Sequence, residues 1–468
     1  MDILLVASEY APWVCHSEVA EALASFSKTL KQVGHSVTVF VPYSTAYEAG
    51  GLLLARRLTP LKINDHDDLT VYDTQLPSGV QLVLVGLGAN TDDHPTANAA
   101  SIFAQAVAAL VKERSDLSFQ TDVIHVHDWF GGLSALALDK LDGPRPPVVF
   151  TIYDINQQDH VATSSNAQLD LGPFAGMPQL TLNGKSNILA AALRTANSVT
   201  TVSNTYARLL GDAVHSGILA SVVQELSSPV VGIVGGIDYA RLNPAIDPLL
   251  IARFDAEDSS QKGTCKTALQ RELGLELDLH CPLLFVPGPL TEKNAGRAVS
   301  SSLPALLGQP ICLVVAAQSA DDDDIAEAVR QLANQWPKRI ALLPINGDRP
   351  LHRAMSAADF ILFTNQRTAL ESGHLFAQRY GAVPVARSNG VFGDSLVDCD
   401  AKLETGTGFL YDEPTVEELT GAVARAISVW GQPGFDRLRR RVMRQDLGWE
   451  RPTRRMLQVY RQVLGIRL

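Results

Sequence analysis

The sequence predicts an α/β protein with two doubly wound, Rossmann-like domains, each built on a parallel sheet. Short apolar runs alternate with helical patterns along the chain, which is typical of a parallel sheet covered by helices on both faces. This pattern restarts after about residue 260. The chain of 468 residues also exceeds the length at which a single hydrophobic core stops growing, so two domains are expected.

The first half of the chain contains six candidate strands. They read DILLVAS (2–8), SVTVFVP (36–42), QLVLVGL (81–87), DVIHVHD (122–128), PVVFTIYD (147–154) and SVTTVS (198–203). Helical patterns lie between them at 18–34 and 99–114. In the first helix, apolar residues recur at helical spacing from Val19 to Val33, and Gly34 ends the helix.

The second half supplies five more candidate strands. They read PLLFVPG (282–288), ICLVVAA (311–317), RIALLPI (339–345), DFILFT (359–364) and AVPVAR (382–387). Two prolines and paired glycines at 235–250 are typical of a domain connection. We therefore expect one domain over 1–245, a second over 246–440 and a terminal amphipathic helix within 441–468. Parallel sheets bind ligands at the carboxyl ends of their strands, so we expect the site in a cleft between the two sheets.

Composition excludes several classes of function. The net charge is −11, from 39 basic and 50 acidic residues, which argues against nucleic acid or an anionic membrane as a partner. The five cysteines are scattered without a C-x-x-C motif, which indicates reduced thiols. The segment MDILLVASEY lacks the basic region of a signal peptide, and no apolar run approaches the roughly 20 residues that span a bilayer. We expect a cytoplasmic protein with no membrane segment and no cofactor.

Several stretches together resemble bacterial glycogen synthases and plant starch synthases, which are retaining glycosyltransferases that use ADP-glucose. The similar stretches are ILLVASEYAP, HVHDWFGGL, NILAAALRTANSVTTVSNTYAR, GIDYARLNPAIDPLL, KTALQRELGL, ADFILF, RYGAVPV and GTGFLYDEPTVEEL. Their order and spacing are kept over essentially the whole chain. The resemblance implies a GT-B fold, in which two Rossmann-like domains face a cleft and the last helix crosses back to the first domain.

The first domain departs from the family at its phosphate-facing positions. The family loop K-T-G-G-L is replaced by CHSEV, which places Cys15 at the lysine and adds Glu18 at the start of a helix. A carboxylate there favours the helix dipole but repels a diphosphate. The family's T-I-H-N is replaced by TIYD, so Tyr153 stands at the histidine and Asp154 at the asparagine. The asparagine of the family's N-G-I-D is replaced by Gly235.

The second domain loses the family's cations. The stretch GPLTEKNAG places Pro289 at the arginine and Asn294 at the lysine that hold the diphosphate in the family. Lys293 lies one position earlier and is an alternative lysine, if the loop shifts by one residue.

The family's essential glutamate is also replaced. Thr368 stands at its position, with Arg367 and Glu371 close in sequence, although Glu371 stands where the family has a glycine. The family loop R-T-G-G-L is replaced by RSNGV, which keeps Gly390. Arg387 matches a family arginine and is the one cation that we still place in the cleft.

The stretch HVHDW carries the best retained polar group at a strand's carboxyl end. His125, His127 and Asp128 suit sugar hydroxyls, and Trp129 suits stacking on a sugar ring. The alternative is that one histidine is a core hydrogen-bonding residue and that Trp129 packs against the domain face. The H-x-H-D spacing also suits a metal, but the family needs none, and we expect no metal.

Three hypotheses follow. In the first, the protein has lost ADP-glucose transfer and binds an α-glucan, an oligosaccharide or a protein of glycogen metabolism, while ADP-glucose is not expected to bind. We then assign no catalytic residue, because the family positions are occupied by Cys15, Tyr153, Pro289, Asn294 and Thr368. In the second, it elongates α-1,4-glucan from ADP-glucose with rearranged residues. In the third, it is a transferase with a changed donor or acceptor that uses Glu371, Tyr153 and Asp154.

Overall fold

The structure is a computed structural model that describes residues 1–63, 68–88, 96–116, 120–143, 145–156, 171–292, 295–363 and 372–466. It divides into two compact units. Unit 1 comprises Met1–Gly235 together with Trp449–Leu468, and unit 2 comprises Gly236–Gly448. The chain therefore leaves unit 1 after Gly235 and returns to it for the last helix.

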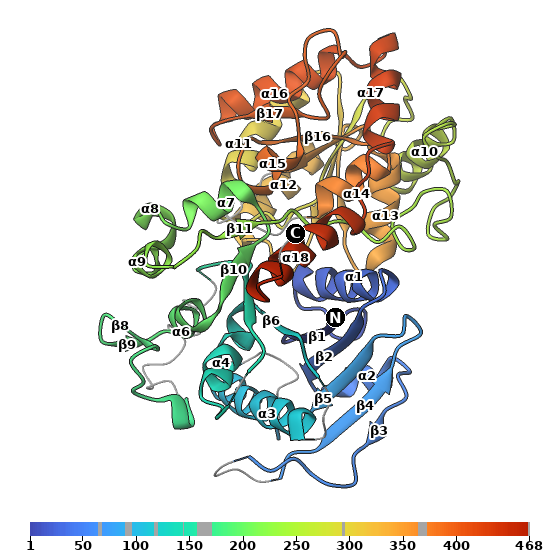
Figure 1. The fold of residues 1–468 in the computed structure, drawn as a ribbon. Helices are drawn as coiled ribbons and strands as arrows, with labels where there is room; N and C mark the ends of the chain where they lie inside the picture. Colours follow the sequence, from blue (N-terminus) through green and yellow to red (C-terminus); the bar gives the residue numbers. More distant parts are fainter. Residues whose placement is uncertain are drawn as a thin grey trace. The chain divides into compact units, whose positions relative to one another are not determined.

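Unit 1 is built on a nine-stranded sheet in the order β11-β10-β7-β6-β1-β2-β5-β4-β3 (Figure 1). All neighbours are parallel except β3, β4 and β5, which pair antiparallel at one edge. The strands are β1 (Asp2–Val6), β2 (Ser36–Pro42), β3 (Ala55–Arg56), β4 (Val71–Gln75), β5 (Gln81–Val85), β6 (Val123–His127), β7 (Val148–Ile152), β10 (Ser198–Thr201) and β11 (Val231–Gly232), with a separate hairpin of β8 (Thr181–Leu182) and β9 (Lys185–Ser186).

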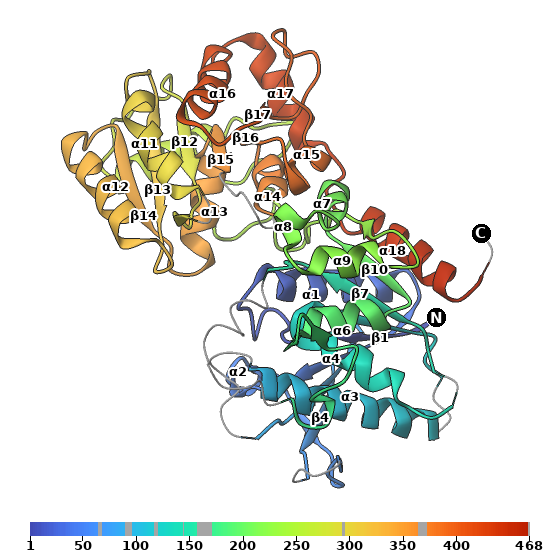
Figure 2. The same cartoon turned by 90° about the vertical axis from the view of Figure 1, so that its left-hand side faces the viewer.

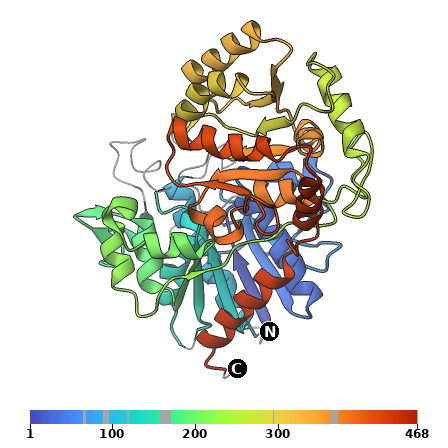
Figure 3. The same ribbon diagram turned by 90° about the horizontal axis from the view of Figure 1, so that it is seen from above.

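Helices cover both faces of this sheet. They are α1 (Glu18–Gln32), α2 (Thr45–Ala49), α3 (Ala97–Asp116), α4 (Asp128–Asp139), the 3₁₀ helix η1 (Gly172–Phe174), α6 (Ile188–Thr195), α7 (Asn204–Leu209), α8 (Ala213–Ser216), α9 (Leu219–Gln224) and α18 (Glu450–Val463). The core on one face joins β1 and β2 to α1 and α18. On the other face α4 contacts both α3 and α6 (Figure 2). Figure 3 shows α18, in dark red, running along this unit to the C-terminus.

Local sequence explains where α1 begins and ends. The side chain of Ser17 caps the helix by accepting a hydrogen bond from the backbone N–H of Val19, and Glu18 lies in the first turn. Gly34 has a φ of +91°, a left-handed conformation that glycine adopts without strain. The predicted helix and its glycine stop are confirmed.

Unit 2 is built on a six-stranded parallel sheet in the order β14-β13-β12-β15-β16-β17. Its strands are β12 (Leu283–Val286), β13 (Cys312–Ala317), β14 (Ile340–Pro344), β15 (Phe360–Phe363), β16 (Val383–Arg387) and β17 (Phe409–Tyr411). Its helices are α10 (Lys262–Glu272), α11 (Gly296–Leu307), α12 (Asp323–Gln335), α13 (Asp348–Ala357), α14 (Gly373–Arg379), α15 (Gly390–Ser395), α16 (Val416–Ser428) and α17 (Pro433–Met443). All eleven strands expected from the sequence are present, and the doubly wound parallel fold class is confirmed.

Candidate functional site

The loop between β1 and α1 is folded around the carboxylate of Glu9. This side chain is buried and accepts hydrogen bonds from the backbone N–H groups of His16, at 2.5 Å, and Ser17, at 3.3 Å. It also accepts a hydrogen bond from the Ser17 hydroxyl. The N–H groups before a helix are a favourable place for a bound anion. In this protein they already hold a carboxylate of the chain itself.

The two residues that the sequence singled out in this loop lie at its surface. Cys15 is exposed, and its thiol lies 3.8 Å from the carbonyl oxygen of Ser17. Glu18 is exposed at the first position of α1. Together with Glu9 it gives the entrance to the helix a negative charge.

His127 and Tyr153 meet at the carboxyl ends of β6 and β7. The Nδ1 atom of His127 lies 2.9 Å from the Tyr153 hydroxyl, and both side chains are buried. The Nε2 atom of His127 is also buried and has no hydrogen-bond partner among the described residues. Burial lowers the pKa of His127 to about 3, so the ring is neutral at pH 7. A neutral imidazole with one open nitrogen suits a hydroxyl group better than a phosphate.

Asp128 begins α4 in a left-handed backbone conformation, with a φ of +58°. Burial, together with the charges of Asp154 and Glu9, raises the pKa of its carboxyl group to about 7, while a hydrogen bond from the backbone N–H of Trp129 opposes this shift. Desolvation and the charges of Asp128 and Glu9 likewise raise the pKa of Tyr153. All the charges that act on Asp128 and Tyr153 here are carboxylates. The carboxyl edge of the unit 1 sheet is therefore acidic.

Asp154 lies beside this cluster and is half-buried. Its Oδ1 atom accepts a hydrogen bond from the backbone N–H of Asn156 at 2.9 Å. The next residue, Ile155, donates its backbone N–H to the hydroxyl of Tyr206 at 3.0 Å. These two hydrogen bonds hold residues 154–156 in place, with the Asp154 carboxylate near Asp128.

His125 lies on the same face of β6 as His127, with their ring centroids 4.0 Å apart, but its ring is enclosed in the core. Its Nδ1 atom lies 2.6 Å from the hydroxyl of Tyr460 in α18, and its Nε2 atom lies 2.6 Å from the hydroxyl of Thr151. The ring has no solvent exposure. The geometry matches the core-histidine alternative for this position. Trp129 is 4% exposed and its ring packs edge-on against Phe130, so little of it faces solvent.

In unit 2 the loop that contains Pro289 is also held by carboxylates. The backbone N–H of Leu290 donates to Oδ1 of Asp321 at 2.8 Å. The backbone N–H of Glu292 donates to Oδ2 of Asp322 at 2.6 Å. These two aspartates precede α12, so the acidic run at 321–324 both starts a helix and holds this loop.

Arg387 ends β16, and its guanidinium is bound by the loop after β17. Its Nε atom donates to the carbonyl of Asp412 at 2.6 Å, and its Nη2 atom lies 3.2 Å from the Glu413 carboxylate. The charge of the one cation expected in the cleft is thus partly neutralised. Gly390 begins α15 with a φ of +49°.

The remaining sequence candidates, Lys293, Asn294, Arg367, Thr368 and Glu371, lie outside the described residues. Within the described part of the chain, no group of three or more His, Cys, Asp or Glu side chains could hold a metal ion. In the same residues, no helix is long and apolar enough to cross a membrane.

The sequence reasoning missed the carboxylates that hold these loops: Glu9, Asp321, Asp322 and Glu413. One signal was available for Glu9. It is a charged residue three positions after the buried strand β1, at the carboxyl end where ligand loops begin.

Two doubly wound parallel-sheet units joined in one chain define the GT-B class of glycosyltransferase folds. The starch synthase IV catalytic domain from Arabidopsis thaliana, solved with ADP and acarbose, superimposes with a TM-score of 0.83 at 22% identity, covering 99% of both chains. Sucrose-phosphate synthase from Thermosynechococcus elongatus superimposes with a TM-score of 0.61 at 13% identity, covering 100% of both.

Sequence comparison identifies the family. Residues 2–224 match the family model of the starch synthase catalytic domain. The glycogen synthase of Burkholderia thailandensis is 30% identical over 479 residues, covering 98% of this chain and 90% of that protein. The glycogen synthase of Thioalkalivibrio sulfidiphilus is 29% identical over 492 residues, covering 99% and 100%. The chain belongs to the glycogen and starch synthase family.

Proposed function

We propose that this protein binds an α-glucan through unit 1 and no longer transfers glucose from ADP-glucose. The observation that carries the proposal is the acidic carboxyl edge of the unit 1 sheet. There Glu9 and Asp154 supply carboxylates, Asp128 adds a carboxyl group with a pKa of about 7, and the nearby His127 is neutral. ADP-glucose carries a diphosphate, and a like charge about 4 Å away is unfavourable by about 1 kcal/mol in water and about 4 kcal/mol near a protein surface.

Unit 2 gives independent support. Pro289 cannot act as a cation, and two backbone N–H groups of its loop are taken up by Asp321 and Asp322. Arg387 is bound to Glu413. A hydrogen bond to a charged group contributes about 1.5–3 kcal/mol, so losing two or three phosphate contacts weakens nucleotide binding by several orders of magnitude.

A neutral sugar suits the same residues. Each glucose unit offers hydroxyl groups that both donate and accept hydrogen bonds. The half-buried carboxylate of Asp154 can accept a hydrogen bond from such a hydroxyl, and the buried His127 and Asp128 lie close to it as a donor and an acceptor. We place this binding protein in the cytoplasm beside glycogen metabolism, with a protein of that pathway as a further candidate partner. The free cysteines fit that compartment.

A second candidate function is active elongation of α-1,4-glucan from ADP-glucose by rearranged residues. It is favoured by the relatives named glycogen synthase, which align with nearly the whole chain. A third is transfer from a changed donor or to a changed acceptor, with Tyr153, Asp154 and Glu371 as its candidate residues. Both require a replacement for the carboxylate that Thr368 has displaced.

Calorimetric titration with ADP, ADP-glucose and maltoheptaose separates these functions. We expect heat of binding only with maltoheptaose, and no saturation with either nucleotide up to ~1 mM. A Kd of ~1 mM corresponds to a binding free energy of about 4 kcal/mol. Tyr153→Phe should weaken maltoheptaose binding several-fold, while Tyr411→Phe, which removes a buried hydroxyl in unit 2, should not. Incorporation of radiolabelled glucose from ADP-glucose into glycogen by the pure protein would establish the second function and overturn the proposal.

A further inference from the structure

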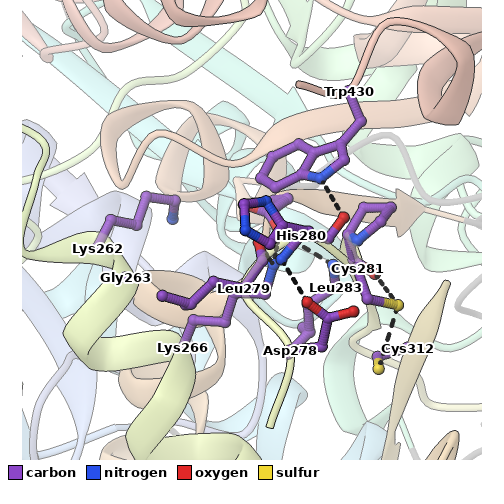
Figure 4. Close-up of polar contacts among 12 residues, drawn as sticks. Lys262, Gly263, Lys266, Asp278, Leu279, His280, Cys281, Leu283, Cys312 and Trp430 are labelled. Atoms are coloured by element: carbon purple, nitrogen blue, oxygen red, sulfur yellow. Dashed lines mark hydrogen bonds and ion pairs between the residues drawn. The ribbon is translucent and has the colours of Figure 1, made fainter. Parts of the chain in front are cut away.

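Two cysteine thiols touch in unit 2, away from the residues considered above. The Sγ atoms of Cys281 and Cys312 lie 3.5 Å apart (Figure 4). Cys281 is half-buried and lies two residues before β12, while Cys312 is buried and begins β13. The backbone already joins the two positions, because the N–H of Cys312 donates to the carbonyl of Pro282 at 2.9 Å.

We propose that Cys281 and Cys312 form a reversible disulfide, which makes the amino ends of β12 and β13 an oxidation site. An S–S bond is about 2.05 Å long, so the two sulfur atoms must approach by about 1.5 Å. The backbone places the two cysteines on neighbouring strand ends, because Leu283 is opposite Cys312 and Cys281 lies two residues before Leu283. By contrast, the buried Cys265 donates its thiol to the carbonyl of Ala252 at 3.2 Å.

The surroundings favour the reaction. The hydrogen bond from the Cys281 thiol lowers the pKa of Cys312, and the positive charges of Arg339 and Lys266 lower it further. The pKa of Cys281 is raised, mainly because it donates this hydrogen bond. Cys312 is thus the favoured thiolate, and Cys281 is the thiol that solvent reaches. This is the arrangement of an accessible cysteine beside a resolving partner.

A low-molecular-weight disulfide such as oxidised glutathione is the oxidant. The Cys312 thiolate takes the proton of the Cys281 thiol as the Cys281 sulfur attacks one sulfur atom of the oxidant, which forms a mixed disulfide and expels one thiolate. That thiolate takes the proton from Cys312. The Cys312 thiolate then attacks the Cys281 sulfur, which forms the protein disulfide and expels the second thiolate. The two cysteines lose two electrons and two protons, and the oxidant becomes two molecules of thiol.

The segment that contains Cys281 contacts residues that line a cavity of about 450 Å³, so oxidation of Cys281 changes the position of those residues. The carbonyl of His280, next to Cys281, accepts a hydrogen bond from Nε1 of Trp430 at 2.9 Å. The Nζ atom of Lys266 lies 4.7 Å from the centre of the Trp430 ring. Both Lys266 and Trp430 line the cavity, so a movement of the segment around Cys281 shifts its wall. Figure 4 shows the hydrogen bond between Trp430 and His280, next to Cys281.

The test is equilibration of the full-length protein with reduced and oxidised glutathione, followed by peptide mapping without reduction. We expect one cross-linked pair of peptides, containing Cys281 and Cys312, which dithiothreitol separates. Cys281→Ser and Cys312→Ser should each abolish the cross-link, whereas Cys265→Ser and Cys15→Ser should leave it. Cys312→Val provides a second variant if the buried serine impairs folding.

Tryptophan emission provides an independent readout. Oxidation should change the emission of the wild type, and the change should be lost in Trp430→Phe and in Cys281→Ser. Two outcomes would overturn the proposal. One is glutathione retained on Cys281 without a cross-link, and the other is free thiols at both positions in oxidised glutathione alone.

Discussion

The Glu9 carboxylate accepts a hydrogen bond from the backbone N–H of His16 at 2.5 Å, at the loop that leads into α1. The same carboxylate also binds Ser17, which in turn caps the helix. The loop therefore needs no external anion to satisfy these N–H groups. The family carries a lysine and glycines in this loop. Both the substitution of those residues and the internal carboxylate therefore support the conclusion that this loop binds no phosphate.

The first prediction concerns this loop. Glu9→Gln should speed hydrogen exchange at the amides of His16 and Ser17, because a neutral amide accepts more weakly than a carboxylate. We expect a loss of about 1.5–3 kcal/mol in the local free energy of opening, measured by native-state hydrogen exchange. Glu18→Gln is the matched control, since that side chain is exposed, and it should change the same exchange rates little. Equal effects of the two variants would contradict the role assigned to Glu9.

A second prediction follows from the buried histidines. Burial lowers the pKa of His127 to about 3 and that of His125 well below its usual value, whereas in the unfolded chain both titrate near 6.5. Between about pH 3 and 6.5 the unfolded state binds more protons, so the free energy of unfolding rises with pH by up to about 1.4 kcal/mol per pH unit for each ring. The contribution of the two histidines to the free energy of unfolding is complete above pH 6.5 and is lost as the pH falls below that value. His127→Gln should flatten this dependence in urea unfolding of the protein between pH 4.5 and 7.5.

Asp128 has the opposite effect on the pH dependence of the free energy of unfolding. Its pKa is about 7 in the folded protein, above the usual 3.8, so the folded state binds more protons between these pH values. Its contribution is present at low pH and is lost as the pH rises to 7. Asp128→Asn should therefore steepen the rise of stability with pH, and asparagine also tolerates the left-handed backbone at this position. The exposed Asp142→Asn should leave the curve unchanged, and a flatter curve for Asp128→Asn would contradict the assignment.

More of the fold than of the site could be predicted from the sequence. Long buried parallel strands are continuous apolar runs, such as ICLVVAA, and these were found, whereas the short parallel strands β11 and β17 were missed. The edge hairpin of β4 and β5 was only half found, because VYDTQ in β4 is partly exposed and carries polar residues. At the site, the sequence located His127 by its place at a strand's carboxyl end, and Tyr153 and Asp154 by the resemblance to the family's T-I-H-N. It could not show that Asp321 would bind Leu290, because 31 residues separate the partners and only the fold brings them together.

The attachment of α18 to unit 1 provides a third test. The Tyr460 hydroxyl and Nδ1 of His125 lie 2.6 Å apart in the core. Tyr460→Phe keeps the ring but leaves a buried nitrogen without its partner, which costs about 1–3 kcal/mol. Limited proteolysis should then cut near the start of α18 faster than in the wild type. Gln458→Ala, on the exposed face of the same helix, should leave the cleavage rate unchanged. Cleavage at the wild-type rate in Tyr460→Phe would show that packing alone holds the helix.

The last prediction concerns a buried charge in unit 2. The Asp359 carboxylate lies 2.7 Å from Nζ of Lys266 and 3.2 Å from Nη2 of Arg439, and it also accepts the backbone N–H of Leu283 at 3.0 Å. Asp359→Asn leaves the buried Lys266 without its counter-charge and removes the closer of the two carboxylates at Arg439, and breaking a buried pair in this way typically costs about 3–5 kcal/mol. We expect a lower melting temperature for unit 2 in calorimetry.

Asp436→Asn is the control for this change, because Asp436 also contacts Arg439, at 3.5 Å, but is 82% exposed. Exposed ion pairs contribute only about 0–1 kcal/mol, so this variant should melt close to the wild type. If the two variants melted together, the burial of Asp359 between Lys266 and Arg439 would not be what stabilises the amino end of β15. A large difference between them, seen in the unit 2 transition alone, would show that one buried carboxylate fixes this end of the sheet against α10 and α17.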